Sequence, residues 1–338
     1  MTFRIAACLA ALLPALPALA HHGVAGVGAA SLEGPGAPVE SASSAVLPAG
    51  KTLLYAKLDH AKFRRGDGTD TEVDTNQYWM AGIGHGFTPW FSAYLFAPYN
   101  RKIDTAEVPG GRPKFDTKGW ADVSVMGQVG FKYDKGLRLI PANESLDDLE
   151  DWRFTVFAGG SIPTGNADLK NRAGDIDPGK STSFGESSWS AGFTATKVLT
   201  PRLTFNTEIS AIRFRTHRYA PDTSNANGVQ VRFGNEDRVN LGLAWRAVTD
   251  PDNKFRADLS LEAQYLALGR DIENGNPQAA TGGRMVYLLP GVRLYKDNMS
   301  FAFGIKSPAW TRLNEGAQQQ GAEGKEKYRL IFSASMLF

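Results

Sequence analysis

The chain has 338 residues, of which 42% are hydrophobic and 21% are charged. Its 37 Lys and Arg nearly balance its 35 Asp and Glu, which gives a formal net charge of +2. This balance excludes the basic excess, gathered on one face, that nucleic-acid-binding proteins need, so we expect no nucleic-acid partner. A single cysteine, Cys8, excludes an internal disulfide. No proline-rich or charged linker divides the chain after residue 50, which favours one main domain.

The first 20 residues have the pattern of a secretory signal peptide. Arg4 precedes an apolar run from Ile5 to Leu19, and Ala18-Leu19-Ala20 is typical of a small-residue cleavage site. We therefore expect export to the cell envelope and a mature protein that begins at His21. The run is too short for a membrane-spanning helix, and no later segment offers about 18 uninterrupted apolar residues.

Residues 21–50 are mostly Ala, Gly, Ser, Val and Pro and follow neither helical nor strand periodicity. We expect them to form a flexible N-terminal extension in the periplasm. His21 and His22 would stand at the mature N-terminus, where the α-amine and an imidazole could together bind copper or zinc. The alternative is that this pair on a flexible tail is incidental.

From residue 51 onward, apolar residues alternate with polar or small ones over segments of about 10 to 14 residues, roughly the length that a tilted strand needs to cross a bilayer. In the clearest case, Ala121–Tyr133, valines and aromatic residues share one parity, whereas Asp122 and Lys132 share the other. The same pattern predicts twelve strands. They are Thr52–Phe63, Gln77–Phe87, Trp90–Ile103, Ala121–Tyr133, a segment from Trp152, a segment from Trp189, Arg202–Phe214, Glu236–Val248, Phe255–Leu268, Arg284–Lys296, Met299–Trp310 and Lys327–Phe338. Because Pro290 cannot donate a ladder hydrogen bond, we expect a bulge at Pro290-Gly291.

The connections between these strands differ in length in a regular way. The second, sixth, eighth and tenth are short, and the fourth, residues 134–151, is longer. The odd-numbered connections, around residues 64–76, 104–119, 163–186, 215–235, 269–283 and 311–326, are long and rich in Gly, Asn, Asp and Lys. Outer-membrane barrels have short periplasmic turns and long external loops. We therefore predict an all-β, transmembrane, antiparallel up-and-down barrel of about 12 strands over residues 51–338, surrounded by outer-membrane lipid, with both termini in the periplasm.

The last strand carries a specific signal, because every second residue from Tyr328 to the terminal Phe338 is apolar. The terminal aromatic residue resembles the C-terminal signature by which outer-membrane barrels are assembled, which implies the barrel-assembly machinery as a partner. The final strand of a soluble β-sandwich is the alternative. Aromatic residues at strand ends, such as Trp152, Trp189 and Trp245, fit the interfacial girdle of a membrane barrel better.

The polar parity predicts a lumen with a basic ring near the periplasmic strand ends and a mixed polar waist deeper inside. The ring consists of Lys132, Arg153, Arg246, Arg256 and Arg293. The waist consists of Asn206, Glu208, Asn240, Glu262 and Gln264. Such a ring favours anionic or polar solutes, because a narrow, low-dielectric mouth focuses the electric field. The alternative is that the arginines pair with Asp258 and other carboxylates and only brace the lumen.

Three short motifs carry a resemblance to a known family. They are Gly159-Gly160-Ser161-Ile162-Pro163-Thr164-Gly165, Glu262, and Leu289-Pro290-Gly291-Val292. Over residues 50–338 the chain resembles the family of outer-membrane transporters named for the meta-cleavage pathway of phenol degradation. The resemblance implies a barrel that moves small aromatic or hydrophobic compounds, and it implies no catalytic residue. The long extension with two histidines departs from the family pattern.

No phosphate-binding loop, metalloprotease helix, nucleophile elbow or paired Cys/His spacing occurs in the sequence, so we expect neither an enzyme nor a cofactor. The leading hypothesis is a channel for passive diffusion of small-molecule solutes. A non-conducting barrel that serves as adhesin, anchor or efflux accessory is the second hypothesis. A lipid-modifying enzyme with a Ser–His pair is the third, although His60, His85 and His217 lie beside no recognisable serine motif.

Overall fold

The computed structural model describes residues 36–64, 74–104, 115–142, 151–315 and 325–338. The predicted signal peptide and the pair His21 and His22 lie outside these ranges. Every regular element in the described part of the chain is a β-strand. Within it, no helix is long and apolar enough to cross a membrane.

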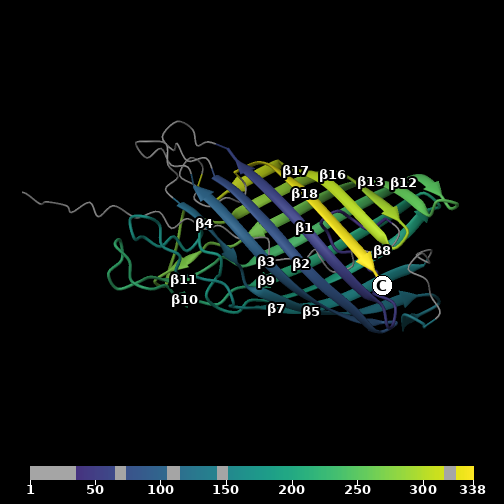
Figure 1. Cartoon of the computed structure of the whole chain (residues 1–338), viewed down its shortest axis with the longest axis horizontal. Coiled ribbons are helices and arrows are strands. Elements are labelled where there is room, and N and C mark those ends of the chain that lie inside the picture. Colours follow the sequence, from purple (N-terminus) through teal and green to yellow (C-terminus); the bar gives the residue numbers. More distant parts are fainter. Residues whose placement is uncertain (1–35, 65–73, 105–114, 143–150, 316–324) are drawn as a thin grey trace, which may run out of the picture.

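Twelve strands close into one antiparallel barrel, which confirms the predicted fold class (Figure 1). They are β1 (Thr52–Phe63), β2 (Asp74–Thr88), β3 (Phe91–Asp104), β5 (Val123–Tyr133), β7 (Trp152–Ile162), β8 (Trp189–Thr200), β9 (Leu203–Arg213), β12 (Glu236–Asp250), β13 (Phe255–Leu268), β16 (Gly283–Lys296), β17 (Met299–Leu313) and β18 (Glu326–Leu337). Each strand pairs with the next barrel strand along the chain. The first and last strands close the barrel, with pairs from Leu53↔Leu337 to Phe63↔Glu326.

The two faces of the barrel have opposite chemistry, as strict alternation along a strand requires. Large apolar side chains such as Leu54, Ile83 and Leu259 are exposed on the outside. Polar side chains such as Asp59 and Glu262 are buried on the inside. A soluble barrel would show the reverse, whereas a barrel that spans a lipid bilayer needs an apolar outer belt and tolerates a polar interior.

The connections alternate in length as predicted. Turns of a few residues join β2 to β3, β8 to β9, β12 to β13 and β16 to β17 at the end of the barrel where the C-terminus lies, here called the short-turn end (Figure 1). At the opposite, long-loop end, the loops form a second sheet of β10 (His217–Arg218), β11 (Gln230–Arg232), β14 (Ile272–Glu273) and β15 (Asn276–Pro277). Phe184 packs against Phe214 and Phe233 beneath it, with ring centroids 4.9 and 5.0 Å apart.

The fourth barrel strand is interrupted. Residues Phe115–Trp120 form a separate strand, β4, and β5 begins only at Val123. Both β4 and β5 pair with β3, but only β5 continues the barrel by pairing with β7. The other edge of β4 therefore has no strand partner in the described part of the chain.

The predicted bulge at Pro290-Gly291 is wrong. Pro290 pairs with Leu261 in a register that does not shift along β13 and β16. Between β16 and β17 the pairs Leu288↔Ser307 and Gly291↔Gly304 keep the same register on both sides of the proline. The missing N–H therefore interrupts the ladder without adding a residue. The bulge lies instead in β17, where Tyr287↔Pro308 and Val286↔Trp310 leave Ala309 unpaired.

Candidate functional site in the lumen and the barrel wall

The lumen of the barrel contains part of its own chain. Residues 36–47, here called the luminal segment, are buried, and Val39 and Ala42 are completely so. The segment comes down to the short-turn end at Gly50, whose N–H donates to Gly86 O at 2.7 Å. For these residues the structure departs from the predicted flexible extension. Carboxylates of the barrel wall accept the backbone hydrogen bonds that the segment cannot make by itself, and glycines of the wall leave room for its side chains.

Glu262 of β13 holds the middle of the luminal segment. Its Oε1 accepts the N–H groups of Val39 at 2.6 Å and Glu40 at 3.2 Å, and its Oε2 accepts that of Ser41 at 2.9 Å. The Ser41 hydroxyl also donates to Oε2. One carboxylate thus satisfies three consecutive backbone donors, which would be costly to bury without a partner. Glu208 accepts the next donor, the N–H of Ala42, at 2.8 Å.

Side chains near the short-turn end hold the beginning of the luminal segment. Arg293 donates from Nη2 to Pro38 O at 2.5 Å and from Nε to Ala37 O at 3.2 Å. Asp258 accepts the N–H of Gly36 at 3.1 Å and also forms a two-point pair with Arg256. Of the predicted basic ring, Arg256 thus pairs with Asp258, and Arg293 donates to backbone carbonyl groups of the luminal segment.

Apolar contacts fix Val39, which packs in a small cluster with Leu289, Ala302 and Ile331. A Cβ at Gly291 would lie 2.6 Å from a Val39 methyl, so glycine is what makes room for this side chain. Other inward-facing glycines make room for the segment in the same way: Gly84 for Leu47, Gly86 for Pro48 and Gly130 for Val46. These glycines are the sequence signal that could have revealed the segment.

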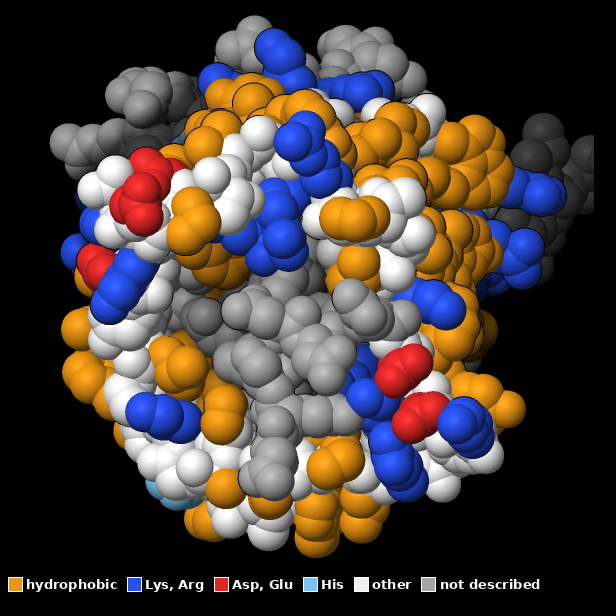
Figure 2. Space-filling model, turned by 90° about the vertical axis from the view of Figure 1, so that its right-hand side faces the viewer, with side chains coloured by type: hydrophobic (Ala, Val, Ile, Leu, Met, Phe, Trp, Pro, Cys, Tyr) orange, Lys and Arg blue, Asp and Glu red, His pale blue; other side chains and the backbone are white. Residues whose placement is uncertain are grey.

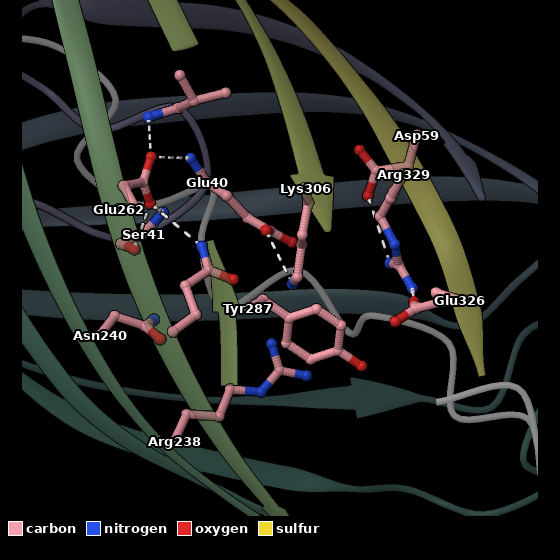
Figure 3. A network of polar contacts seen from close by, with 12 residues as sticks. Glu40, Ser41, Asp59, Arg238, Asn240, Glu262, Tyr287, Lys306, Glu326 and Arg329 are labelled. Carbon is pink, nitrogen blue, oxygen red and sulfur yellow. Dashed lines mark hydrogen bonds and ion pairs between the residues drawn. The ribbon is translucent and has the colours of Figure 1, made fainter. Parts of the chain in front are cut away.

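A buried network of charges surrounds the apex of the segment (Figure 3). Glu40 lies between two ammonium groups, 3.0 Å from Lys306 Nζ and 4.0 Å from Lys57 Nζ. Lys57 also pairs with Asp59 at 3.1 Å, and Asp59 lies 3.9 Å from Arg329. Sequence reasoning missed this network, although its strand members share the inward parity with their polar neighbours.

A pocket lies beside this network. Its lining includes Arg238, Asn240, Gln264, Tyr287, Lys306, Glu326 and Arg329. Lys306 Nζ lies 4.7 Å from the centroid of the Tyr287 ring, which is a cation–π contact. The pocket presents both charged and aromatic groups and so has no single electrostatic preference.

All eleven predicted pore-lining residues occupy inward-facing, buried or half-buried positions. They are Lys132, Arg153, Asn206, Glu208, Asn240, Arg246, Arg256, Asp258, Glu262, Gln264 and Arg293. Basic side chains gather around the rim when the short-turn end is viewed end-on (Figure 2). The Lys132 ammonium is 2.9 Å from the carboxylate of Asp151. That these eleven residues line a conducting path stays a prediction.

A second pocket, here called the wall pocket, lies on the inner side of the barrel wall close to the end of β4. Tyr78, Pro98 and Phe184 give it apolar surface. Its polar surface comes from Asn100, Lys102, Asp122 and several hydroxyl side chains, among them Ser124, Ser161 and Ser188. Asp122 shapes it, because its carboxylate accepts the N–H groups of Gly165 and Phe184, each at 3.1 Å. Here a loop, and not a strand, completes the barrel wall.

Large apolar side chains surround this place on the outside of the barrel. Trp120 ends β4 and is 63% exposed, and Ile162 and Trp189, at the adjoining ends of β7 and β8, are each 52% exposed. The Trp120 ring packs edge-on against Tyr99 at 5.7 Å. An apolar surface on the lipid side therefore lies across the barrel wall from the wall pocket, whose lining is of mixed character.

The described residues contain no group of three or more His, Cys, Asp or Glu side chains that could hold a metal ion. His85 Nδ1 lies 3.0 Å from the Thr52 hydroxyl, and His217 packs edge-on against Tyr219 with ring centroids 4.8 Å apart.

Comparison with known proteins gives structural likeness only. No protein-family model and no curated protein matches the sequence. The structure is similar to the COG4313 outer membrane channel from Pseudomonas putida F1, with a TM-score of 0.63 and 14% identity over 87% of this chain and 97% of that one. It is less similar to the beta domain of the Bordetella autotransporter BrkA, with a TM-score of 0.47, 11% identity and coverage of 85% and 99%. The TodX monoaromatic hydrocarbon channel mutant gives a TM-score of 0.36, 9% identity and 95% coverage of both chains. The first likeness supports the barrel fold.

Proposed function

We propose that the protein is an outer-membrane channel for small apolar solutes, including small aromatic compounds, which enter it through the barrel wall beside β4. The observation that carries the proposal is the edge of β4 that has no strand partner in the described part of the chain, with the wall pocket close to it, in a barrel whose lumen contains residues 36–47. The similar fold of an outer membrane channel supports it.

The chemistry of the lumen does not suit an apolar solute. Such a solute concentrates in lipid and gains nothing by crossing a lumen lined with buried charges such as Glu262 and Lys306. The wall pocket instead lies across the barrel wall from the exposed Trp120 and Trp189 and offers apolar surface at Tyr78 and Phe184. A concave site that combines apolar surface with fixed polar groups is a usual form of a small-molecule site.

Filling the wall pocket tests the proposal. Ser188→Trp places a large ring in the pocket, and Leu241→Trp adds the same ring on the lipid-facing surface of β12 as a control. We expect Ser188→Trp to reduce the uptake of radiolabelled toluene, measured in cells that lack the native protein, and Leu241→Trp to leave it unchanged. Ser188→Ala, which leaves the pocket open, should also keep uptake.

Heat-modifiable migration on gels confirms that each variant folds as a barrel. Native uptake by a folded Ser188→Trp variant would overturn the wall path. Equal uptake by cells with and without the native protein would overturn the channel itself and favour an anchoring or adhesive barrel.

A further inference from the structure

Two arginines face each other on the outside of the barrel at its long-loop end. Arg284 of β16 pairs directly with Arg312 of β17, and both side chains are exposed. The Cβ atoms of such a cross-strand pair lie about 5 Å apart, and like charges directly opposite each other are destabilising. This pair therefore has an energetic cost unless an anion lies between the two guanidinium groups.

The bulge at Ala309 places Arg312 on this face. Before the bulge, even-numbered residues of β17 such as Ser300, Ala302 and Lys306 point into the barrel and are buried. After it, Trp310 is 48% exposed and Arg312 is exposed as well. Re-aiming a side chain is a common use of a bulge. Without the extra residue the Arg284–Arg312 pair would not exist.

No described acidic residue contacts either arginine. The neighbour of Arg284 on its other side, across β13, is Ala267. Two other outward arginines near the same end are neutralised: Arg101 forms a two-point pair with Asp116, with both distances 2.9 Å, and Arg213 lies 2.6 Å from Asp237. The Arg284–Arg312 pair thus differs from its own surroundings.

The position of the pair along the barrel coincides with a membrane interface. In the row below it lie Tyr265, Val286 and Trp310, and aromatic residues of this kind favour the lipid headgroup level. From Arg284 the outward residues of β16 are apolar down to Lys296. Twelve residues along a strand tilted by about 40° span roughly 30 Å of bilayer, the thickness of its hydrocarbon core.

We propose that Arg284 and Arg312 bind the phosphate of a glycolipid in the outer leaflet, whose acyl chains lie along the apolar outer face of β13, β16 and β17. Two guanidinium groups match a phosphate in charge and in hydrogen-bond geometry. The long-loop end of an outer-membrane barrel faces the cell exterior, where this lipid is found. The site is independent of the wall pocket and of any transported solute.

Native mass spectrometry of the detergent-solubilised barrel with bisphosphorylated lipid A tests the proposal. Because each arginine near an anionic lipid surface strengthens attraction about fivefold, the double variant R284Q/R312Q should bind about thirtyfold more weakly. Arg101→Gln, which removes an arginine near the same end that is already paired, should bind as the native protein does. Chemically dephosphorylated lipid A should bind the native barrel and R284Q/R312Q equally weakly.

Thermal unfolding of Arg312→Gln gives a second test, because the difference in stability from the native barrel should change sign when lipid A is added. In lipid-free detergent the variant should be at least as stable as the native barrel, because a like-charge contact is gone. With lipid A present the native barrel should become the more stable one, because lipid binds its folded state more tightly. The proposal would be overturned if lipid A bound the native barrel and R284Q/R312Q with equal affinity. It would also be overturned if the native barrel bound lipid A and dephosphorylated lipid A with equal affinity.

Discussion

Two parts of the barrel wall are built differently. Between β13 and β16 fourteen consecutive pairs, from Phe255↔Lys296 to Leu268↔Gly283, form a ladder without a register shift. At β4 and β5 the ladder breaks after Trp120, and a loop closes the wall through Asp122. The regular wall supplies Asp258, Glu262 and Arg293, which hold the luminal segment, whereas the wall pocket lies behind the irregular wall. The docking of the luminal segment and the break in the strand ladder thus belong to different sides of the molecule.

Among the changes that separate the two walls, removal of the luminal segment should have the largest effect, and that effect should be on conductance. A variant that lacks residues 36–47 keeps every barrel strand but loses the chain that lies in the lumen. We expect its single-channel conductance in planar bilayers to rise severalfold, because the freed lumen is lined by charged side chains that hold water. A folded variant with native conductance would show that the segment does not obstruct the axis.

The substitution Asp122→Ala should have the second-largest effect, which is a local loss of stability in the irregular wall. It removes the acceptor of two backbone N–H groups, those of Gly165 and Phe184, at a cost of about 3 kcal/mol. Hydrogen exchange should become faster in residues 164–184 and stay native in residues 255–268. Equal changes in both regions would mean that the two walls are not independent.

The substitution Glu262→Gln tests the regular wall, which holds the luminal segment. The amide keeps the shape but removes the negative charge that accepts three backbone N–H groups, which should weaken docking of the segment by about 2 kcal/mol. Because the segment then leaves the lumen more often, brief openings in single-channel recordings should become more frequent. Leu261→Ala, on the lipid-facing side of the same strand, should leave the openings native.

The substitution Val39→Ala should have the smallest effect. It removes two buried methyl groups from contact with Leu289 and Ile331, which costs about 1 to 2 kcal/mol. We expect a slightly higher opening frequency, smaller than that of Glu262→Gln, and unchanged thermal unfolding of the barrel. A larger effect than that of Glu262→Gln would assign the docking energy to packing.

Much of the barrel could be predicted from the sequence because its physics is local. Alternation between lipid-facing and inward residues is visible within each strand, and all twelve predicted strands are present. The strand Phe255–Leu268 has the bounds that were predicted. The eleven predicted pore-lining residues point inward for the same reason.

The rest of the site depends on contacts between distant parts of the chain. The luminal segment has no periodicity, because it is held residue by residue from the wall, as when Val39 reaches Glu262 more than 200 positions away. The gap at Asp122 depends on a loop that follows β7. Ala309, the bulged residue of β17, resembles any other strand alanine. Pattern reasoning within one strand contains none of this information.

The path of the luminal segment has a topological consequence. Gly36 lies beside Asp258 and Asn206, near the short-turn ends of β13 and β9, and Gly50 lies beside Gly86 at the short-turn end of β2. The described segment therefore rises to Glu40 and returns through the same mouth, as a loop that is inserted and not threaded. The described residues can therefore be inserted and withdrawn through one mouth. Residues 36–47 need not be in place before the last strand closes, so that barrel closure and occupation of the lumen by this segment are separable events.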